Sequence, residues 1–320
     1  MFPTGLHHLT AIASDPQTNV DFYAGLLGLR LVKRTVNFDD PSAYHLYYGD
    51  ETGTPGSIVT FFYWAGYEAR GRVGYGQSTA LVFSAPADSL HFWQQRLQRH
   101  GVAATHCRRF GEDIVAFLDP DGIPVEIVAV AADSRVGWQA HPDVPAALAL
   151  RGLHTAELTV REANPTEALL TGPMGYQRVC SQRNRVRFVA ASALGSVGAS
   201  GRFIDVIEDA TGTPGVSGAG TVHHVAWSVP DDDTEIGLQT RLKQAGHAVS
   251  EVRDRTYFQS IYYREPGGVL FEIASAKPGF FIDETVAKLG STLRLPGAFE
   301  RARGEIESHL PPLAPARRYT

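Results

Sequence analysis

The chain has 320 residues, which is enough for about two domains of ordinary size. Its 29 Lys and Arg residues against 34 Asp and Glu leave a formal charge of −5, so no basic excess is available to neutralise a nucleic-acid backbone. No apolar run approaches the roughly 18 residues of a membrane-spanning helix, and the first residues lack the basic start and apolar stretch of a signal peptide. We therefore expect a cytoplasmic protein with neither nucleic-acid nor membrane partners.

One pattern of a strand, a helix and three further strands recurs four times along the chain. In the first copy a strand-like run at 5–11 precedes an amphipathic helical stretch at 16–27, a glycine stop at Gly28, and strand-like runs at 30–36, 44–48 and 57–63. The later copies begin with strand-like runs at 78–84, 153–160 and 222–229, and their helices are expected at 90–100, up to about 175, and at 234–245. The repeat predicts four βαβββ modules.

The first strands of the modules align with one another, and so do the turns before the last strands. Gly5-Leu6-His7-His8 matches Gly152-Leu153-His154-Thr155 and Thr221-Val222-His223-His224, and the turns Pro120-Asp121-Gly122 and Pro266-Gly267-Gly268 each lead into a final strand. We predict an α+β fold in which the four modules form two open β-barrels, followed by a C-terminal helical tail.

The domain boundaries follow from composition. Residues 1–140 hold the first pair of modules, 150–276 the second pair, and 277–320 the tail, with a linker at 133–150 that contains Pro142 and Pro145. Helical periodicity at 284–289 and 299–309 indicates that the tail packs over a barrel or on a partner subunit. A homo-oligomer is therefore one expectation, although the sequence does not fix the number of subunits.

Strand alternation points three side chains of metal-ligand type into a barrel. His8 shares the smaller, more polar face of its strand with Thr10, and His224 lies on the corresponding face of the 222–229 strand. Glu272 lies between Phe271 and Ile273, whose large apolar side chains point the other way. A carboxylate on an inward face needs a compensating partner.

Two imidazoles and one carboxylate form the facial triad of non-heme Fe(II) oxygenases, which leaves positions open for substrate and O2. Pairing the modules in chain order would separate His8 from His224 and Glu272. Pairing module 1 with module 4 brings all three together and leaves Thr79, Glu126 and Thr155 in the barrel of modules 2 and 3, which would be a poor metal site. We therefore predict the 1+4 and 2+3 pairing.

The remaining conspicuous residues receive structural interpretations. Glu126 is expected to form hydrogen bonds rather than bind metal, and Cys107 and Cys180 to be reduced, partly buried thiols. The aromatic run at 61–64 could wall a substrate cavity, but such a run is more often part of the hydrophobic core, and we assign both this run and His45 to the core.

These residues carry a family resemblance over nearly the whole chain. Gly5-Leu6-His7-His8-Leu9-Thr10, residues 44–50, residues 220–226 and the segment from Asp254 to Ile273 resemble the vicinal oxygen chelate (glyoxalase/bleomycin resistance/dioxygenase) superfamily. Within it the chain is most similar to ring-cleaving dioxygenases of the hydroquinone/chlorohydroquinone 1,2-dioxygenase type.

The resemblance implies that His8, His224 and Glu272 bind Fe(II), with Mn(II) as the alternative metal, and that the substrates are a small aromatic molecule and O2. It also implies supporting catalytic positions at the following residues: His7, Thr10, His223, Arg255 and Tyr262. Here Tyr262 would position a substrate hydroxyl and Arg255 would stabilise negative charge. The implied activity is Fe(II)-dependent opening of a hydroquinone-type ring, substituted or chlorinated rings included, in the catabolism of aromatic compounds.

Two alternatives stay open at this point. One is a glyoxalase-like metal-dependent isomerase or lyase, whose sites usually have four protein ligands; the segment 57–61 offers no carboxylate as the fourth. The other is a non-catalytic small-molecule binding protein, which would not require the His, His, Glu combination.

Overall fold

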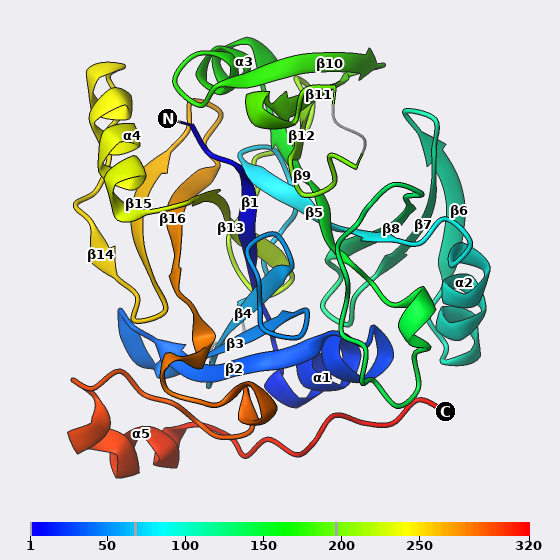
Figure 1. The fold of residues 1–320 in the computed structure, drawn as a ribbon, viewed down its shortest axis with the longest axis vertical. Coiled ribbons are helices and arrows are strands. Elements are labelled where there is room, and N and C mark those ends of the chain that lie inside the picture. The colour runs from blue at the N-terminus through cyan, green and yellow to red at the C-terminus, as the bar shows by residue number, and fades with distance from the viewer. Residues whose placement is uncertain (1, 67–68, 196–197) are drawn as a thin grey trace.

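The structure is a computed structural model that describes residues 2–66, 69–195 and 198–320. Its strands form two curled eight-stranded sheets (Figure 1). The first sheet has, in spatial order, β14 (Arg253–Asp254), β15 (Phe258–Arg264), β16 (Leu270–Pro278), β13 (Thr221–Val229), β1 (Gly5–Ile12), β4 (Ile58–Trp64), β3 (Asp40–Gly49) and β2 (Arg30–Asn37). The second has β10 (Tyr176–Gln182), β11 (Arg185–Ala190), β12 (Phe203–Glu208), β9 (Gly152–Val160), β5 (Gln77–Ala85), β8 (Pro124–Ala129), β7 (Glu112–Leu118) and β6 (Ala104–Arg109).

The strand order confirms the predicted fold and the exchanged pairing of modules. The first sheet joins module 1 to module 4 through antiparallel pairing of β1 with β13, and the second joins modules 2 and 3 through β5 and β9. In each module the first strand also runs parallel to the last, as β13 does with β16. Each sheet therefore combines one module from each half of the chain.

Each module carries its helix where the periodicity predicts one. In module 1, α1 (Pro16–Val20) begins at Asp15, whose carboxylate caps the amide of Thr18. It continues into a π-helical stretch, η1 (Asp21–Leu26), and ends before Gly28, whose φ of 71° suits a residue without Cβ. The other module helices are α2 (Leu90–Arg99), α3 (Ala163–Thr171) and α4 (Asp232–Gln244), and η2 (Ala146–Leu148) and η3 (Ala191–Ala193) are short 3₁₀ turns.

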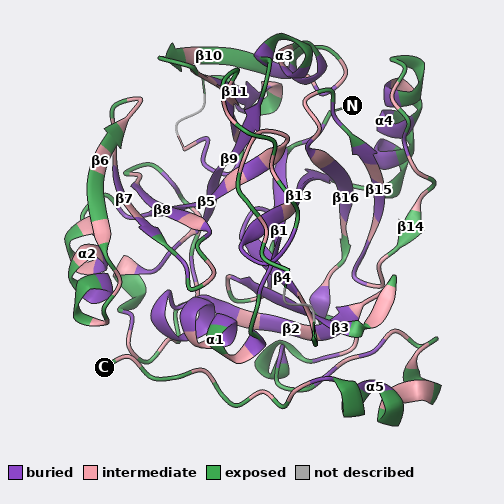
Figure 2. Ribbon diagram, turned by 180° about the vertical axis from the view of Figure 1, so that it is seen from behind, coloured by how far each residue is buried: buried purple, intermediate pink, exposed green. Residues whose placement is uncertain are grey.

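The two sheets meet along their central strands, which are the most buried part of the molecule (Figure 2). Gly5 and Gly152 stand at equivalent module starts, with φ of 154° and 133°. A Cβ on Gly5 would lie 2.7 Å from the Gly201 carbonyl oxygen, and one on Gly152 2.8 Å from that of Gly56. Glycine therefore permits backbone from one sheet to approach the other closely.

Two side-chain hydrogen bonds also link the sheets, and in each one a carboxylate in the final turn of a module is the acceptor. The Tyr23 hydroxyl of module 1 donates to Asp119 in the turn of module 2 at 2.9 Å. The Thr166 hydroxyl of module 3 donates to Glu265 in the turn of module 4 at 2.7 Å. Module 1 is thus held to module 2, and module 3 to module 4, although the members of each pair belong to different sheets.

The tail lies along the outer edge of the first sheet, below β2 and α1 in Figure 1. Its helical segments are short: η4 (Phe280–Ile282), η5 (Val286–Lys288), η6 (Glu300–Ala302) and α5 (Arg303–His309). The chain after α5 is extended and contacts α1, where the Ala314 amide donates to Gln17 at 2.8 Å. Packing of the tail on a barrel is therefore observed.

Two other expectations are addressed directly by the fold. Cys107 on β6 and Cys180 on β10 are free thiols of intermediate exposure on opposite edge strands of the second sheet. Within the described ranges, the helices are too short or too polar to cross a lipid bilayer.

Candidate metal centre

Three neighbouring strands place His8, His224 and Glu272 on one inward face of the first sheet. His8 is on β1, His224 on β13 and Glu272 on β16, and all three are buried. The Nε2 atoms of the histidines lie 3.2 Å apart. Glu272 Oε2 lies 3.3 Å from His8 Nε2 and 2.9 Å from His224 Nε2. The side chains predicted as metal ligands therefore meet at one point.

The spacing of these three atoms fits a metal ion. Ligand atoms about 2.1 Å from an ion and at right angles to one another are separated by about 3.0 Å, close to all three observed distances. Glu272 Oε2 is fully buried and receives no hydrogen bond of acceptable geometry from the described residues. A buried carboxylate oxygen without a donor, facing two imidazole nitrogens, is the arrangement that a cation would complete.

The protonation states also suit a metal. Burial lowers the pKa of His224, so this ring is neutral and has a lone pair to offer. Burial alone would raise the pKa of Glu272, but the adjacent histidines hold it well below its usual value. Neutral imidazole and ionised carboxylate are the forms that bind metal.

The first histidine of each doublet supports the second. Nδ1 of His7 lies 2.9 Å from Nδ1 of His8, and the same atoms of His223 and His224 are 2.8 Å apart. Burial lowers the pKa of both His7 and His223 to about 3, so both rings are neutral. If Nε2 of His8 binds metal, its Nδ1 carries the hydrogen and donates it to His7, which orients the ligand ring.

Tyr262 and Arg255 extend the site towards its mouth. The Tyr262 hydroxyl donates to Glu272 Oε1 at 2.9 Å and accepts from Arg255 Nε at 3.1 Å and from Ser260 Oγ at 2.9 Å. Burial raises the pKa of Tyr262 above its ordinary value, with the Glu272 charge adding to the effect, so the phenol keeps its proton.

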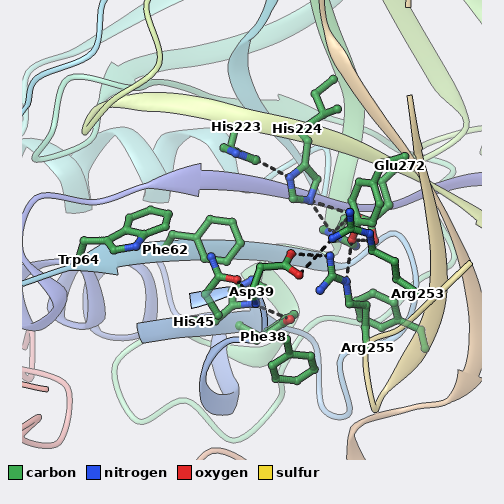
Figure 3. Close-up of a pocket in the computed structure, with 16 residues that line it drawn as sticks. Phe38, Asp39, His45, Phe62, Trp64, His223, His224, Arg253, Arg255 and Glu272 are labelled. Atoms are coloured by element: carbon green, nitrogen blue, oxygen red, sulfur yellow. Dashed lines mark hydrogen bonds and ion pairs between the residues drawn. The ribbon is translucent and has the colours of Figure 1, made fainter. Parts of the chain in front are cut away.

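A cavity of about 270 Å³ opens on this centre (Figure 3). Its lining comprises His8, Asn37, Phe38, Asp39, His45, Tyr47, Phe62, Trp64, His223, His224, Arg253, Arg255, Phe258, Tyr262, Leu270 and Glu272. Phe62 and Trp64 lie on one side of the cavity, and Arg253 and Arg255 on the other. One wall is therefore aromatic and the other cationic.

The structure corrects two core assignments made from the sequence. His45 lines the cavity, where its Nε2 is 2.8 Å from Thr60 Oγ1 and its Nδ1 is 2.9 Å from the Tyr47 hydroxyl. Phe62 and Trp64 of the 61–64 run also line the cavity, whereas Phe61 packs in the core. Strand alternation was the signal available, because it separates Phe62 and Trp64 from Phe61.

Two of the implied supporting residues lie outside the cavity lining. Thr10 bonds Thr60 Oγ1 at 2.8 Å, and Thr60 in turn contacts His45. His7 packs against Phe258, with ring centroids 5.0 Å apart. Both therefore reach the centre only through a neighbour, whereas His223, Arg255 and Tyr262 line the cavity directly.

The second sheet has an arginine at the corresponding place. Glu126, the counterpart of Glu272, accepts two hydrogen bonds from Arg109, at 2.6 and 2.8 Å. Arg109 also donates to Glu157 at 2.8 Å. The structural role expected for Glu126 is confirmed, because a guanidinium neutralises this carboxylate.

Comparison with known proteins agrees with this architecture. The profile of the Glyoxalase/Bleomycin resistance protein/Dioxygenase superfamily matches residues 5–127 and 149–273. The chain belongs to this superfamily.

Relatives within the superfamily match the chain over almost its entire length. A Bacillus subtilis protein named as a candidate ring-cleaving dioxygenase, MhqO, is 44% identical over 311 residues, which is 96% of each chain. The chlorohydroquinone/hydroquinone 1,2-dioxygenase of Sphingobium indicum is 36% identical over 94% of each chain. A crystal structure of a candidate dioxygenase from Bacillus subtilis has a TM-score of 0.93, with 42% identity and 99% coverage of both chains.

Glyoxalase I from Zea mays has the same fold at greater distance. Its crystal structure has a TM-score of 0.62 at 12% identity, covering 85% of this chain and 92% of that one. This likeness concerns the fold alone.

Proposed function

We propose that the protein is an Fe(II)-dependent, extradiol-type dioxygenase that opens a hydroquinone-type aromatic ring with O2. The convergence of His8, His224 and Glu272 at mutual distances of 2.9 to 3.3 Å carries this proposal. The names of the 44% and 36% identical relatives support ring cleavage, and the second supports a hydroquinone substrate. Bound Fe(II) would supply the electron transfer between ring and O2 that an all-protein site lacks.

The cavity suits a small phenol. The aromatic wall of Phe62 and Trp64 offers faces against which a planar ring can pack. The opposite wall supplies the Arg255 guanidinium, which would stabilise a phenolate oxygen beside the metal centre. A ring bound between them would place its oxygen towards Arg255 and the metal centre and its carbon atoms against the aromatic wall.

Protein groups would hold protons at defined atoms. The Tyr262 hydroxyl donates its one proton to Glu272 Oε1 and accepts from Arg255, so it would turn from Glu272 to donate that proton to a substrate oxygen. His223 also lines the cavity. Because its Nδ1 would accept the hydrogen of His224 Nδ1, its other ring nitrogen would carry a hydrogen that it can donate to a bound oxygen. These roles for Tyr262 and His223 are part of the proposal.

The strand register argues against the four-ligand glyoxalase-like alternative. On β13 the residue two beyond His224 is Ala226, which pairs with Glu272 on β16. On β1 the residue two beyond His8 is Thr10, which pairs with Thr60 on β4. Thr60 therefore occupies the position symmetrical to Glu272, and its hydroxyl is already bonded to His45.

Oxygen uptake tests the proposal. Protein reconstituted anaerobically with Fe(II) or Mn(II) is mixed with hydroquinone, substituted and chlorinated hydroquinones and catechol, with metal-free protein as the control. We expect oxygen consumption and a ring-opened acid only with the loaded protein and a hydroquinone. Absence of uptake with every ring, together with stoichiometric Zn in the purified protein, would refute it.

A further inference from the structure

The end of β2 and the turn that follows it form part of the cavity wall. Asn37, Phe38 and Asp39 of this segment all line the cavity, although they belong to module 1 and the cationic wall belongs to module 4. Figure 3 shows the Asp39 carboxylate directed at the two arginines. Its Oδ1 lies 3.1 Å from Arg253 Nη1 and its Oδ2 2.8 Å from Arg255 Nη2.

Asp39 ends a continuous chain of hydrogen bonds that starts at a predicted metal ligand. Glu272 Oε1 accepts from the Tyr262 hydroxyl at 2.9 Å, and that hydroxyl accepts from Arg255 Nε at 3.1 Å. Arg255 then donates through Nη2 to Asp39. Because Nε and Nη2 belong to one rigid guanidinium plane, the position of Asp39 determines how Arg255 meets Tyr262.

We propose that Asp39 is a positioning residue for the ring-opening reaction: from the turn after β2 it holds the Arg255 guanidinium against the Tyr262 hydroxyl. The proposal rests on the proposed function for its kinetic consequence but not for the contact itself. It makes the turn of module 1 part of a site whose proton-bearing groups come from module 4.

Exposure and charge support this role. The Arg255 side chain is 14% exposed, whereas the Asp39 side chain is 55% exposed, so the carboxylate anchors an inner group from the surface. The hydrogen bond from Arg255 lowers the pKa of Asp39, which keeps it ionised. Among the ion pairs of the described residues, Asp39 is the one carboxylate paired with Arg255. Loss of the Asp39 charge therefore leaves the Arg255 guanidinium with no carboxylate to hold it in place.

Kinetic measurements on Asp39→Asn, Asp39→Glu and Arg253→Gln test the proposal. Asparagine keeps the size but loses the charge, so we expect kcat to fall about ten-fold with a smaller change in KM. Glutamate restores the charge and should recover most of kcat. Arg253→Gln removes the other ion pair but leaves the chain to Glu272 intact, and should lower kcat less than Asp39→Asn does.

A double-mutant cycle separates positioning from general stability. If Asp39 acts through Tyr262, Asp39→Asn should cost little further kcat in a Tyr262→Phe background. An equal fold-loss in both backgrounds would overturn the proposal, as would a loss in Arg253→Gln that matches Asp39→Asn.

Amide hydrogen exchange tests the contact without any substrate. The amides of Arg255 and Tyr257 are hydrogen-bonded, to the carbonyls of Phe258 and Arg255, and they lie next to the proposed contact. Asp39→Asn should speed their exchange several-fold, whereas Asp39→Glu should leave it near the wild-type rate. Unchanged exchange in Asp39→Asn would refute the positioning contact; faster exchange in a protein without oxygenase activity would uphold it and refute the proposed function instead.

Discussion

Tyr262 and Glu272 face each other across the β15–β16 pair, and the tyrosine hydroxyl donates to Glu272 Oε1 at 2.9 Å. The hydrogen bond occupies one carboxylate oxygen, so the other, Oε2, is the one turned towards the two histidines. It also fixes the phenol at the edge of the cavity. The same hydrogen bond therefore orients the Glu272 carboxylate and holds the Tyr262 hydroxyl at the cavity.

Tyr262→Phe removes this hydroxyl while keeping the ring. We expect kcat for ring opening to fall about 100-fold, because a positioned proton donor contributes roughly that much. Metal affinity should fall by no more than about 10- to 100-fold, because Glu272 loses one supporting hydrogen bond while both histidines and the carboxylate remain. Steady-state oxygen uptake and metal analysis of the same preparation provide the two readouts, and full activity in the variant would exclude Tyr262 from the reaction.

His8→Ala removes one of the three converging side chains. Metal affinity should fall by more than about 100-fold, with loss of oxygen uptake, because loss of a supporting group alone costs about 10- to 100-fold. Glu126→Gln is the matched control: it alters the corresponding carboxylate in the second sheet, which Arg109 neutralises, and should retain metal. Metal retained by His8→Ala, or lost from folded Glu126→Gln, would contradict the assignment.

Glu235 on α4 is fully buried, and neither carboxylate oxygen has a hydrogen-bond partner among the described residues. Burial raises its pKa to about 8, and the charges of Asp232 and Glu272 add to the shift. The folded protein therefore holds a proton that the unfolded chain releases above pH 4.5, so the unfolding free energy should fall as pH rises from about 4.5 to 8.

The slope from this one group approaches about −1.4 kcal/mol per pH unit, and Glu235→Gln should remove it. Urea unfolding at several pH values across this window measures the difference between the two proteins. Parallel pH dependence in wild type and variant would show that Glu235 is ionised in the folded state.

Lys33 on β2 is completely buried and pairs with Asp283 at 2.6 Å and with Glu284 of the tail. Lys33→Met should destabilise the fold by about 3 kcal/mol, because it deprives the buried Glu284 carboxylate of its nearest cation and leaves only Arg294, at 3.6 Å. Lys243→Met removes a lysine from the exposed pair with Glu251 and should cost less than about 1 kcal/mol. Denaturant unfolding of both variants measures the two losses of unfolding free energy. A loss in Lys33→Met as small as that in Lys243→Met would show that the tail contact adds no stability.

The repeated module, the inward face of its strands and the candidate metal ligands could all be predicted from the order of the amino acids. Alternation is a local property of a strand, so it placed His8, His224 and Glu272 on inward faces without knowledge of the partner strands. The requirement that buried groups of this kind meet one another then selected the pairing of module 1 with module 4, which the strand order confirms.

The surroundings of these three side chains became known only from the folded arrangement. His45 and Phe62 on module 1 strands line the cavity because β3 and β4 curl around it, and Asp39 reaches Arg255 across a sequence separation of 216 residues. Arg109 neutralises Glu126 in the second sheet for a similar reason, since β6 curls over β8. Such contacts depend on sheet curvature and side-chain reach, and no local periodicity in the chain encodes either.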